Sequence, residues 1–376
     1  MRGAEDPGRY LVRRRLGEKC DGLGGGSREA GEAPFPDGNR RRPGLPMNED
    51  ALEWPLTRRQ VLTAGFAAGA GLLMGCGSPE PAAAGWTFVD DRKQTVRLSA
   101  RPTRIVAYTT TAVALRQWGV TPVGVFGDNP REDPVLAGFP WGKSEIVGSV
   151  YGEIDIAKLL SLKAELIVSQ WYPPPADSAL FGFKDLAQQK QIGAQVPIVG
   201  LSGHVIGSKQ IDRFGALARA LGSETMAGAI VRARAAFLRA GASLSGIARR
   251  KSNLRIIAVS GDQNTMYVAK LADSGDLAFY RHRGVPLVSA QTSDAYWDRF
   301  SWDQAGKYPA DGILYDARPI TLPLRQAKHI PAFAALPAVR ANQVGVWRAD
   351  PPPSYQAYTV AMNDLATTIT GWRRLT

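Results

Sequence analysis

The feature that most constrains the fold is an alternation of short apolar segments with amphipathic segments. Apolar runs of this kind are typical of strands buried on both faces, and strands separated by helices predict a parallel sheet covered by helices. In the first half of the chain, the predicted strands are Arg104–Tyr108, Val123–Phe126, Glu165–Gln170 and Val196–Val199, and the predicted helices are Thr111–Trp118, Asp155–Leu162 and Asp185–Ile192. Two short strands, Trp86–Asp90 and Thr95–Leu98, are predicted before them.

A long helical pattern, Glu224–Arg250, interrupts this alternation, with Ser223 as the predicted N-cap. At 1.5 Å per residue it would extend about 40 Å, enough to cross a domain. The alternation then restarts, with predicted strands Arg255–Val259, Met266–Val268, Pro286–Val288, Gly312–Tyr315 and Gln343–Trp347 and a final helix Ser354–Trp372. The fold class is therefore α/β, with two parallel-sheet lobes, residues 86–223 and 251–376, bridged by one long helix, residues 224–250.

The N-terminal region has the pattern of an export leader. Residues 1–46 are rich in Gly, Arg and Pro and lack periodicity, which indicates either a disordered extension or a true start at Met47 rather than Met1. Residues 47–75 are predicted to be a signal peptide, because the apolar run Val61–Gly75 is too short to cross a hydrocarbon core of about 30 Å. The pair Arg58-Arg59 resembles a twin-arginine export signal, although an ordinary basic segment for the general route is the alternative.

Leu73–Cys76 resembles a lipobox, in which the cysteine is lipidated and becomes the mature N-terminus. Residues 76–85 then form a polar, Pro- and Ala-rich linker, so a buried structural role for Cys76 is disfavoured. We therefore expect a protein anchored by lipid at Cys76 to the outer face of the cytoplasmic membrane.

Composition and motifs exclude several function classes. The net charge of +12 is dispersed, and no Lys/Arg run interleaved with aromatic residues follows Arg59, so nucleic-acid binding is not expected. The two cysteines, Cys20 and Cys76, leave the rest of the chain without a disulfide or thiolate metal site. No nucleophile elbow, phosphate-binding Walker loop or dinucleotide fingerprint is present, so we do not expect an enzyme.

Several fragments over residues 86–376 together resemble the periplasmic-binding-protein family of iron-siderophore and cobalamin ABC importers. They are R-P-T-R-I-V-A-Y, W-G-V-T-P-V-G-V, I-D-I-A-K-L-L-S-L-K-A-E-L-I-V, F-S-W-D-Q-A-G-K-Y-P-A-D-G-I-L-Y-D and L-P-A-V-R-A-N-Q-V-G-V-W, in this order, with the long helix between the third and fourth. The resemblance implies a class III solute-binding-protein fold with a shallow cleft and a rigid bridging helix.

The function implied by this resemblance is capture of a ferric siderophore and its delivery to an ABC permease and its ATPase. The protein would be a monomer without a cofactor of its own, since the ligand carries the chelated Fe³⁺. Cobalamin, haem or another bulky solute is the alternative ligand. A surface sensor or interaction protein that kept the fold without transport is the alternative function.

A receptor for such a ligand needs aromatic walls and Arg or Tyr donors. Residues of these types at predicted strand ends, together with neighbouring polar residues, are the candidate ligand-binding residues: Tyr108, Thr109, Trp171, Tyr172, His204, Trp297, Trp302, Tyr315, Arg318 and Tyr355. A core position for Trp297 and Trp302, and a local salt bridge with Asp316 for Arg318, are the alternatives. The only histidines, His204, His282 and His329, are far apart in sequence, so no metal site is expected.

The family also implies two docking acids, one on each lobe, that pair with permease arginines. In F-S-W-D-Q the matching residue is Asp303, which is shorter than the family's glutamate; helix capping is its alternative role. In the first lobe the matching position is Ala157, which is uncharged, so Asp155 or Glu153 is predicted to substitute.

Overall fold

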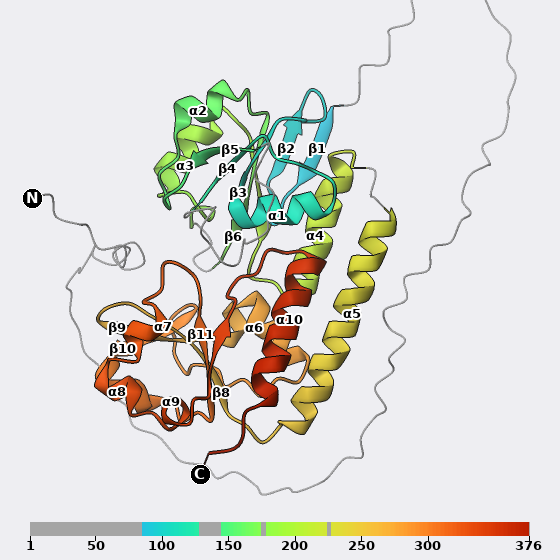
Figure 1. Cartoon of the computed structure of the whole chain (residues 1–376). Coiled ribbons are helices and arrows are strands. Elements are labelled where there is room, and N and C mark those ends of the chain that lie inside the picture. The colour runs from blue at the N-terminus through green and yellow to red at the C-terminus, as the bar shows by residue number, and fades with distance from the viewer. Residues whose placement is uncertain (1–84, 128–143, 174–177, 224–226, 376) are drawn as a thin grey trace, which may run out of the picture. The chain divides into compact units, whose positions relative to one another are not determined.

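The computed structural model describes residues 85–127, 144–173, 178–223 and 227–375 (Figure 1). The predictions for Arg58, Arg59 and Cys76, and for residues 224–226 of the long helix, lie outside these residues. Among the described residues, no helix combines the length and apolarity that a membrane span needs.

The first lobe is built on a five-stranded sheet in which every strand pair is parallel. Its order is β5-β4-β3-β6-β7. The strands are β3 (Ile105–Tyr108), β4 (Gly124–Phe126), β5 (Glu145–Gly148), β6 (Leu166–Trp171) and β7 (Ile198–Ser202). Side chains of β3 are buried on both faces, as the apolar run predicted. The helices are α1 (Thr109–Gln117), α2 (Ile156–Ser161), α3 (Leu186–Gly193) and α4 (Gly207–Ala220).

A two-stranded antiparallel ribbon precedes this sheet, formed by β1 (Trp86–Val89) and β2 (Thr95–Leu98). The indole nitrogen of Trp86 donates to the carbonyl oxygen of Ala220 at 2.8 Å. This bond fixes the start of the described chain against the end of α4.

The second lobe has a five-stranded sheet of order β10-β9-β8-β11-β12. The predicted parallel arrangement holds for β8 (Ile256–Gly261), β11 (Gly312–Asp316) and β12 (Val344–Trp347). However, β9 (Thr265–Ala269) pairs antiparallel with both β8 and β10 (Trp297–Ser301). The sheet is therefore mixed, because a short turn after β8 brings the chain straight back along it.

The remaining elements of the second lobe are short, except for the last helix. They are η4 (Leu271–Asp273), α6 (Gly275–His282), η5 (Trp302–Lys307), α7 (Leu324–Ala327), α8 (Pro331–Ala334), α9 (Pro337–Arg340) and α10 (Tyr355–Thr370). The predicted strand Pro286–Val288 contributes only an isolated bridge between Leu287 and Ile256.

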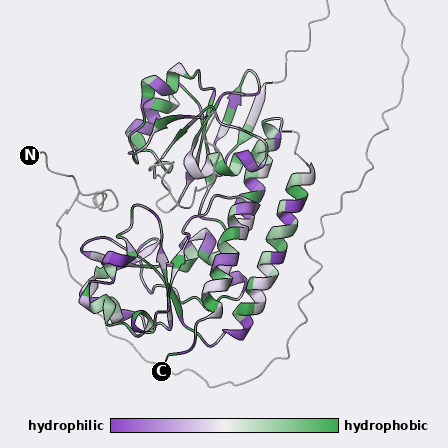
Figure 2. Cartoon of the chain, in the orientation of Figure 1, coloured by the Kyte–Doolittle hydropathy of each residue, from purple (hydrophilic) through white to green (hydrophobic). Residues whose placement is uncertain are grey.

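The long helix α5 (Ala227–Arg250) links α4 to β8 and packs along α10 (Figure 1). Its Phe237 contacts the rings of Phe279, Tyr355 and Tyr358. These rings belong to a core that also includes the inner faces of both sheets. Two smaller cores cover the other face of each sheet, and Figure 2 shows the apolar strands inside both lobes. The hydroxyl of Ser223 donates to the carbonyl oxygen of Trp118, and the residues that it was predicted to cap lie outside the described ones.

Candidate functional site

Six aromatic side chains form a continuous cluster that includes residues of both lobes. The ring of Phe181 contacts Tyr108, Tyr151 and Tyr172, with centroid distances of 5.2, 5.4 and 5.2 Å. From Tyr172 the contacts continue to Tyr296 of the second lobe at 6.5 Å, and from there to His204 at 6.4 Å. We call Tyr108, Tyr151, Tyr172, Phe181, His204 and Tyr296 the aromatic cluster. All except Tyr108 are partly exposed, so the cluster offers ring surface to a solute.

Tyr296 fixes the second-lobe side of this cluster. Its hydroxyl donates to the carbonyl oxygen of Pro173 at 2.6 Å, and its backbone nitrogen donates to the Asp273 carboxylate at 3.0 Å. The backbone of Tyr296 has φ +65°, which is unusual for a bulky residue. Burial, together with the carboxylates of Asp273 and Asp350, raises the pKa of the Tyr296 hydroxyl, so it stays a neutral donor.

An ion-pair network follows β11 and β12 in the second lobe. The Arg318 guanidinium contacts Asp316 at 2.7 Å and Asp350 at 2.7 Å. Burial alone would lower the pKa of Arg318, but the two carboxylates raise it above its ordinary value. Burial, and then the Asp350 carboxylate, raises the pKa of the Tyr172 hydroxyl, while Arg318 lowers it, so the charges of the network act on the first-lobe side of the aromatic cluster. The salt bridge with Asp316, left open by the sequence, is present.

Asp276 extends this network as a buried acid at the start of α6. Its Oδ2 accepts from the indole nitrogen of Trp347 at 2.8 Å, whereas Oδ1 is buried without a hydrogen-bond partner among the described residues. Burial, and then the nearby Asp350 carboxylate, raises the pKa of Asp276 to about 7. Arg318 is thus fully paired with two carboxylates, and Asp276 adds a third acid beside them.

Three predicted ligand-binding residues lie in the cores rather than in the aromatic cluster. Trp302 donates to the Asp262 carbonyl oxygen at 3.0 Å and is 5% exposed. Tyr315, 2% exposed, donates to the Leu322 carbonyl oxygen at 2.7 Å. The ring of Tyr355 packs between Trp118 and Phe237. All three side chains are buried, so their rings pack in the interior of the described structure.

Three further predicted ligand-binding residues make none of the ring contacts that define the aromatic cluster. Trp171 ends β6 and packs, partly buried, against the outer core of the first lobe. Trp297 contacts the rings of Tyr267 and Trp347. Thr109 is buried at the start of α1. The structure brings Tyr108, Tyr172 and His204 together, and it adds Tyr151, Phe181 and Tyr296, which sequence reasoning missed because they lie outside predicted strand ends.

Metal-ligating side chains do not converge in the described part of the chain. Within those residues, no group of three or more His, Cys, Asp or Glu side chains is arranged to hold an ion. The Nδ1 atom of His204 is buried and lacks a hydrogen-bond partner among the described residues.

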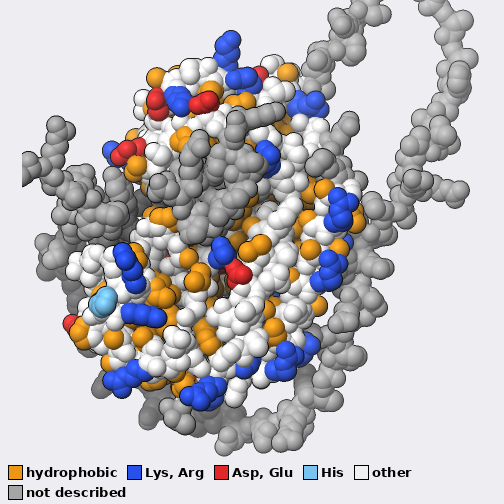
Figure 3. Space-filling model, viewed as in Figure 1, with side chains coloured by type: hydrophobic (Ala, Val, Ile, Leu, Met, Phe, Trp, Pro, Cys, Tyr) orange, Lys and Arg blue, Asp and Glu red, His pale blue; other side chains and the backbone are white. Residues whose placement is uncertain are grey.

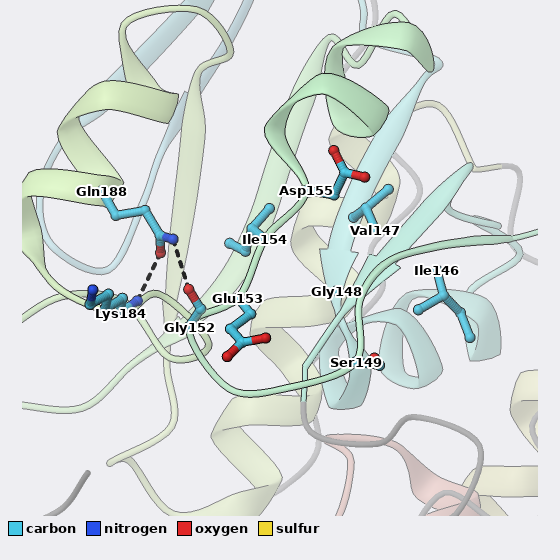
Figure 4. Close-up of a pocket in the computed structure, with 10 residues that line it drawn as sticks. All are labelled: Ile146, Val147, Gly148, Ser149, Gly152, Glu153, Ile154, Asp155, Lys184 and Gln188. Carbon is cyan, nitrogen blue, oxygen red and sulfur yellow. Dashed lines mark hydrogen bonds between the residues drawn. The ribbon is translucent and has the colours of Figure 1, made fainter. Parts of the chain in front are cut away.

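The predicted docking acids of the first lobe line an open hollow of about 530 Å³ (Figure 4). Asp155 is the N-cap of α2, where its carboxylate accepts from the backbone nitrogen of Lys158 at 2.8 Å. Glu153 is exposed, and its carboxylate points away from that of Asp155. Both acids are exposed, and Asp155 has in addition a local structural role as a helix cap.

Asp303 of the second lobe is exposed in the first turn of η5. The N-cap of η5 is Ser301, and no side chain makes a capping hydrogen bond there. Asp303 therefore does not perform the capping role that was its alternative.

Comparison with solved structures gives the fold a family context. A ferric-siderophore receptor protein, DesE, from Streptomyces coelicolor superimposes with a TM-score of 0.71 at 28% identity, covering 77% of this chain and 100% of that one. The chain has the fold of the siderophore-binding proteins. This fold recurs in FhuD from Vibrio cholerae, a siderophore binding protein solved with Fe³⁺-Desferal (TM-score 0.54, 15% identity, 72% and 99% covered).

A siderophore periplasmic binding protein from the fuscachelin gene cluster of Thermobifida fusca shares the siderophore-binding fold too. Its TM-score is 0.52 at 19% identity, with 72% of this chain and 98% of that one covered. No family model and no curated protein sequence matches this chain. The resemblance seen in the sequence fragments and the α/β fold class are confirmed by these structures.

Proposed function

We propose that this protein is an extracytoplasmic receptor that captures a ferric siderophore and delivers it to an ABC importer. The observation that carries the proposal is the aromatic cluster, which joins residues of both lobes in a fold shared with a ferric-siderophore receptor. Stacked and edge-on rings contact a bulky chelate without replacing the ligands of its metal. The scarcity of converging metal ligands among the described residues supports the same conclusion.

The charges beside the cluster favour a neutral or cationic complex. Arg318 is already paired with Asp316 and Asp350, and Asp276 lies in the same region. A highly anionic catecholate complex would meet this acidic excess without a free arginine in the network. A neutral or cationic hydroxamate-type complex would not be repelled by these carboxylates.

The resemblance of L-M-G-C to a lipobox supports anchoring through Cys76. We expect the Cys76→Ser variant to move from the membrane fraction to the soluble fraction of exporting cells. The comparison uses immunoblots of fractions washed in high salt, which removes electrostatically bound protein. Membrane retention of the variant after this wash would contradict the lipid anchor.

Iron uptake by cells tests whether the protein delivers a ferric siderophore to an ABC importer. A strain lacking this protein should lose accumulation of radioactive iron supplied as one ferric siderophore, and the wild-type gene should restore it. Uptake of iron supplied with a different carrier serves as the control. Unchanged uptake from every ferric siderophore tested would contradict the transport role and favour a sensor or interaction protein.

A further inference from the structure

The outer face of α5 carries positive charge that is not paired with carboxylates in the part of the chain that the structure describes. The helix contains five arginines and neither Asp nor Glu. Arg232, Arg239, Arg249 and Arg250 are exposed, and among the described residues none of these four forms an ion pair with a carboxylate. Lys and Arg side chains accordingly lie along the edge of the molecule formed by α5 in Figure 3.

Three of these arginines lie on one side of the helix. Arg232, Arg239 and Arg250 are separated by seven and eleven residues, spacings that return to the same stripe of an α-helix. Arg249 and Arg250 also suit the negative end of the helix dipole, but Arg232 lies near its positive end. Helix stability therefore does not account for the whole stripe.

Large apolar side chains are exposed beside the arginines. Val231 is 66% exposed and Leu238 is 43% exposed, and they precede Arg232 and Arg239 directly. Figure 2 shows polar and apolar residues alternating along α5. Arginines next to exposed apolar groups fit a surface that offers both negative charge and hydrocarbon.

The start of the folded region is bonded to the end of α4, seven residues along the chain before α5 begins. Trp86 is bonded to Ala220, which ends α4, and α5 begins at Ala227. Only nine residues, 77–85, separate Cys76 from Trp86, a reach of at most about 35 Å. A lipid on Cys76 would hold this end of the molecule near a bilayer.

We propose that the exposed face of α5, centred on Arg232, Leu238, Arg239 and Arg250, binds the anionic lipid headgroups of the membrane surface. This contact would orient the tethered receptor. A second copy of this chain fits the face poorly, because it would place like charges against each other. The proposal uses the anchor at Cys76 to explain how the face reaches the bilayer, but its test removes the anchor and so can fail independently.

The test uses the full chain carrying Cys76→Ser, mixed with vesicles of phosphatidylcholine alone or with one quarter phosphatidylglycerol, and measures cosedimentation. On this background, Arg232→Glu, Arg239→Glu and Arg250→Glu are combined in one variant. The matched control combines Arg97→Glu, Arg299→Glu and Arg325→Glu, three arginines that are exposed elsewhere and change the net charge equally. Both variants keep the same leader, so its contribution cancels. Thermal unfolding confirms that both are folded.

We expect the α5 variant to lose about tenfold or more of its partitioning onto phosphatidylglycerol vesicles, and the control variant to lose much less. Raising the salt concentration should remove the difference between them. Equal losses in the two variants would overturn the proposal, as would equal binding to both kinds of vesicle. A change in sedimenting mass without vesicles would assign the face to self-association instead.

A position-specific readout complements cosedimentation. Ser243 is exposed on α5 and Gly306 is exposed on η5, so each can be replaced by a cysteine carrying a fluorophore in a Cys20→Ser, Cys76→Ser background. Brominated lipids should quench the label at 243 more strongly than the label at 306. Equal quenching, or stronger quenching at 306, would overturn the proposed orientation.

Discussion

Within the aromatic cluster, Tyr172 is the residue that connects the rings of the two lobes. Tyr172 contacts both Phe181 of its own lobe and Tyr296 of the other. Trp171, its neighbour, packs against the outer core of the first lobe, which also includes Tyr108 and Phe181 of the cluster but not Tyr172. Adjacent residues on an extended segment point to opposite sides, which explains this difference.

This difference leads to a paired prediction for ligand affinity. Tyr172→Ala should weaken ferric-siderophore binding by about 1–3 kcal/mol, the cost of removing a ring that anchors a ligand. Trp171→Ala, which the sequence also predicted to weaken binding, should have the smaller effect on affinity and the larger effect on the free energy of unfolding. Calorimetric titration and denaturant unfolding measure the two quantities. A larger affinity loss for Trp171→Ala would place the ligand on the opposite side of β6.

Asp276 should make stability depend on pH. Its pKa is raised to about 7 in the folded protein, above the usual value of 3.8. Between these values the folded state binds more protons than the unfolded state, so stability falls as pH rises from about 4 to about 7 and the effect levels off above.

Asp276→Asn keeps an oxygen for Trp347 and removes the charge, so this variant should unfold at higher denaturant than the wild type at pH 8. The two proteins should differ least near pH 4. Denaturation monitored by circular dichroism at both pH values is the measurement. A constant difference, or a less stable variant at pH 8, would show that Asp276 is ionised without penalty.

At the scale of the element, α5 is a helix with one buried and one exposed side. Phe237 is 4% exposed and contacts three aromatic rings, whereas Leu238 is 43% exposed. Phe237→Ala should therefore cost about 3–5 kcal/mol of unfolding free energy through lost packing and a cavity. Leu238→Ala should cost much less, because little apolar area returns to water. Comparable losses would mean that α5 does not pack through Phe237 onto α6 and α10.

The sequence predicted most elements whose apolar pattern is strong. The buried run of β3 and the 24-residue α5 are examples. In contrast, α4 was missed, because it begins and continues with glycines that lower helix propensity. Gly215 is needed there, since an added Cβ would lie 2.8 Å from Trp118. Tertiary packing therefore forms this helix against its local preference.

Strand direction was another property that the apolar pattern did not contain. The residues of β9 and β11 are similarly buried, yet β9 runs antiparallel to β8 and β11 runs parallel to it. Direction depends on the length of the connection, which is short between β8 and β9. The contribution of Tyr296 to the site was equally hidden, because it depends on an unusual backbone conformation.

At the scale of the whole molecule, delivery requires docking onto a permease. Asp303 suits this role because it is exposed and does not cap η5. Asp303→Lys should therefore leave ligand affinity unchanged while sharply reducing iron uptake. Asp303→Glu, which restores the family's residue, should retain uptake. Normal uptake by Asp303→Lys at normal protein levels would contradict docking through Asp303. A parallel loss of ligand binding would instead indicate a structural role.

Direct binding of a ferric siderophore is the measurement that tests the central claim. Calorimetric titration of the Cys76→Ser protein with iron-loaded hydroxamates and catecholates, their iron-free forms, cobalamin, haem, and ferric ion in a weak chelator compares all candidates in one assay. We predict micromolar or tighter binding of one or more ferric siderophores, stronger for neutral or cationic complexes, and no specific binding of ferric ion. Binding of cobalamin or haem alone, or of none of these ligands by the folded protein, would contradict the proposed function.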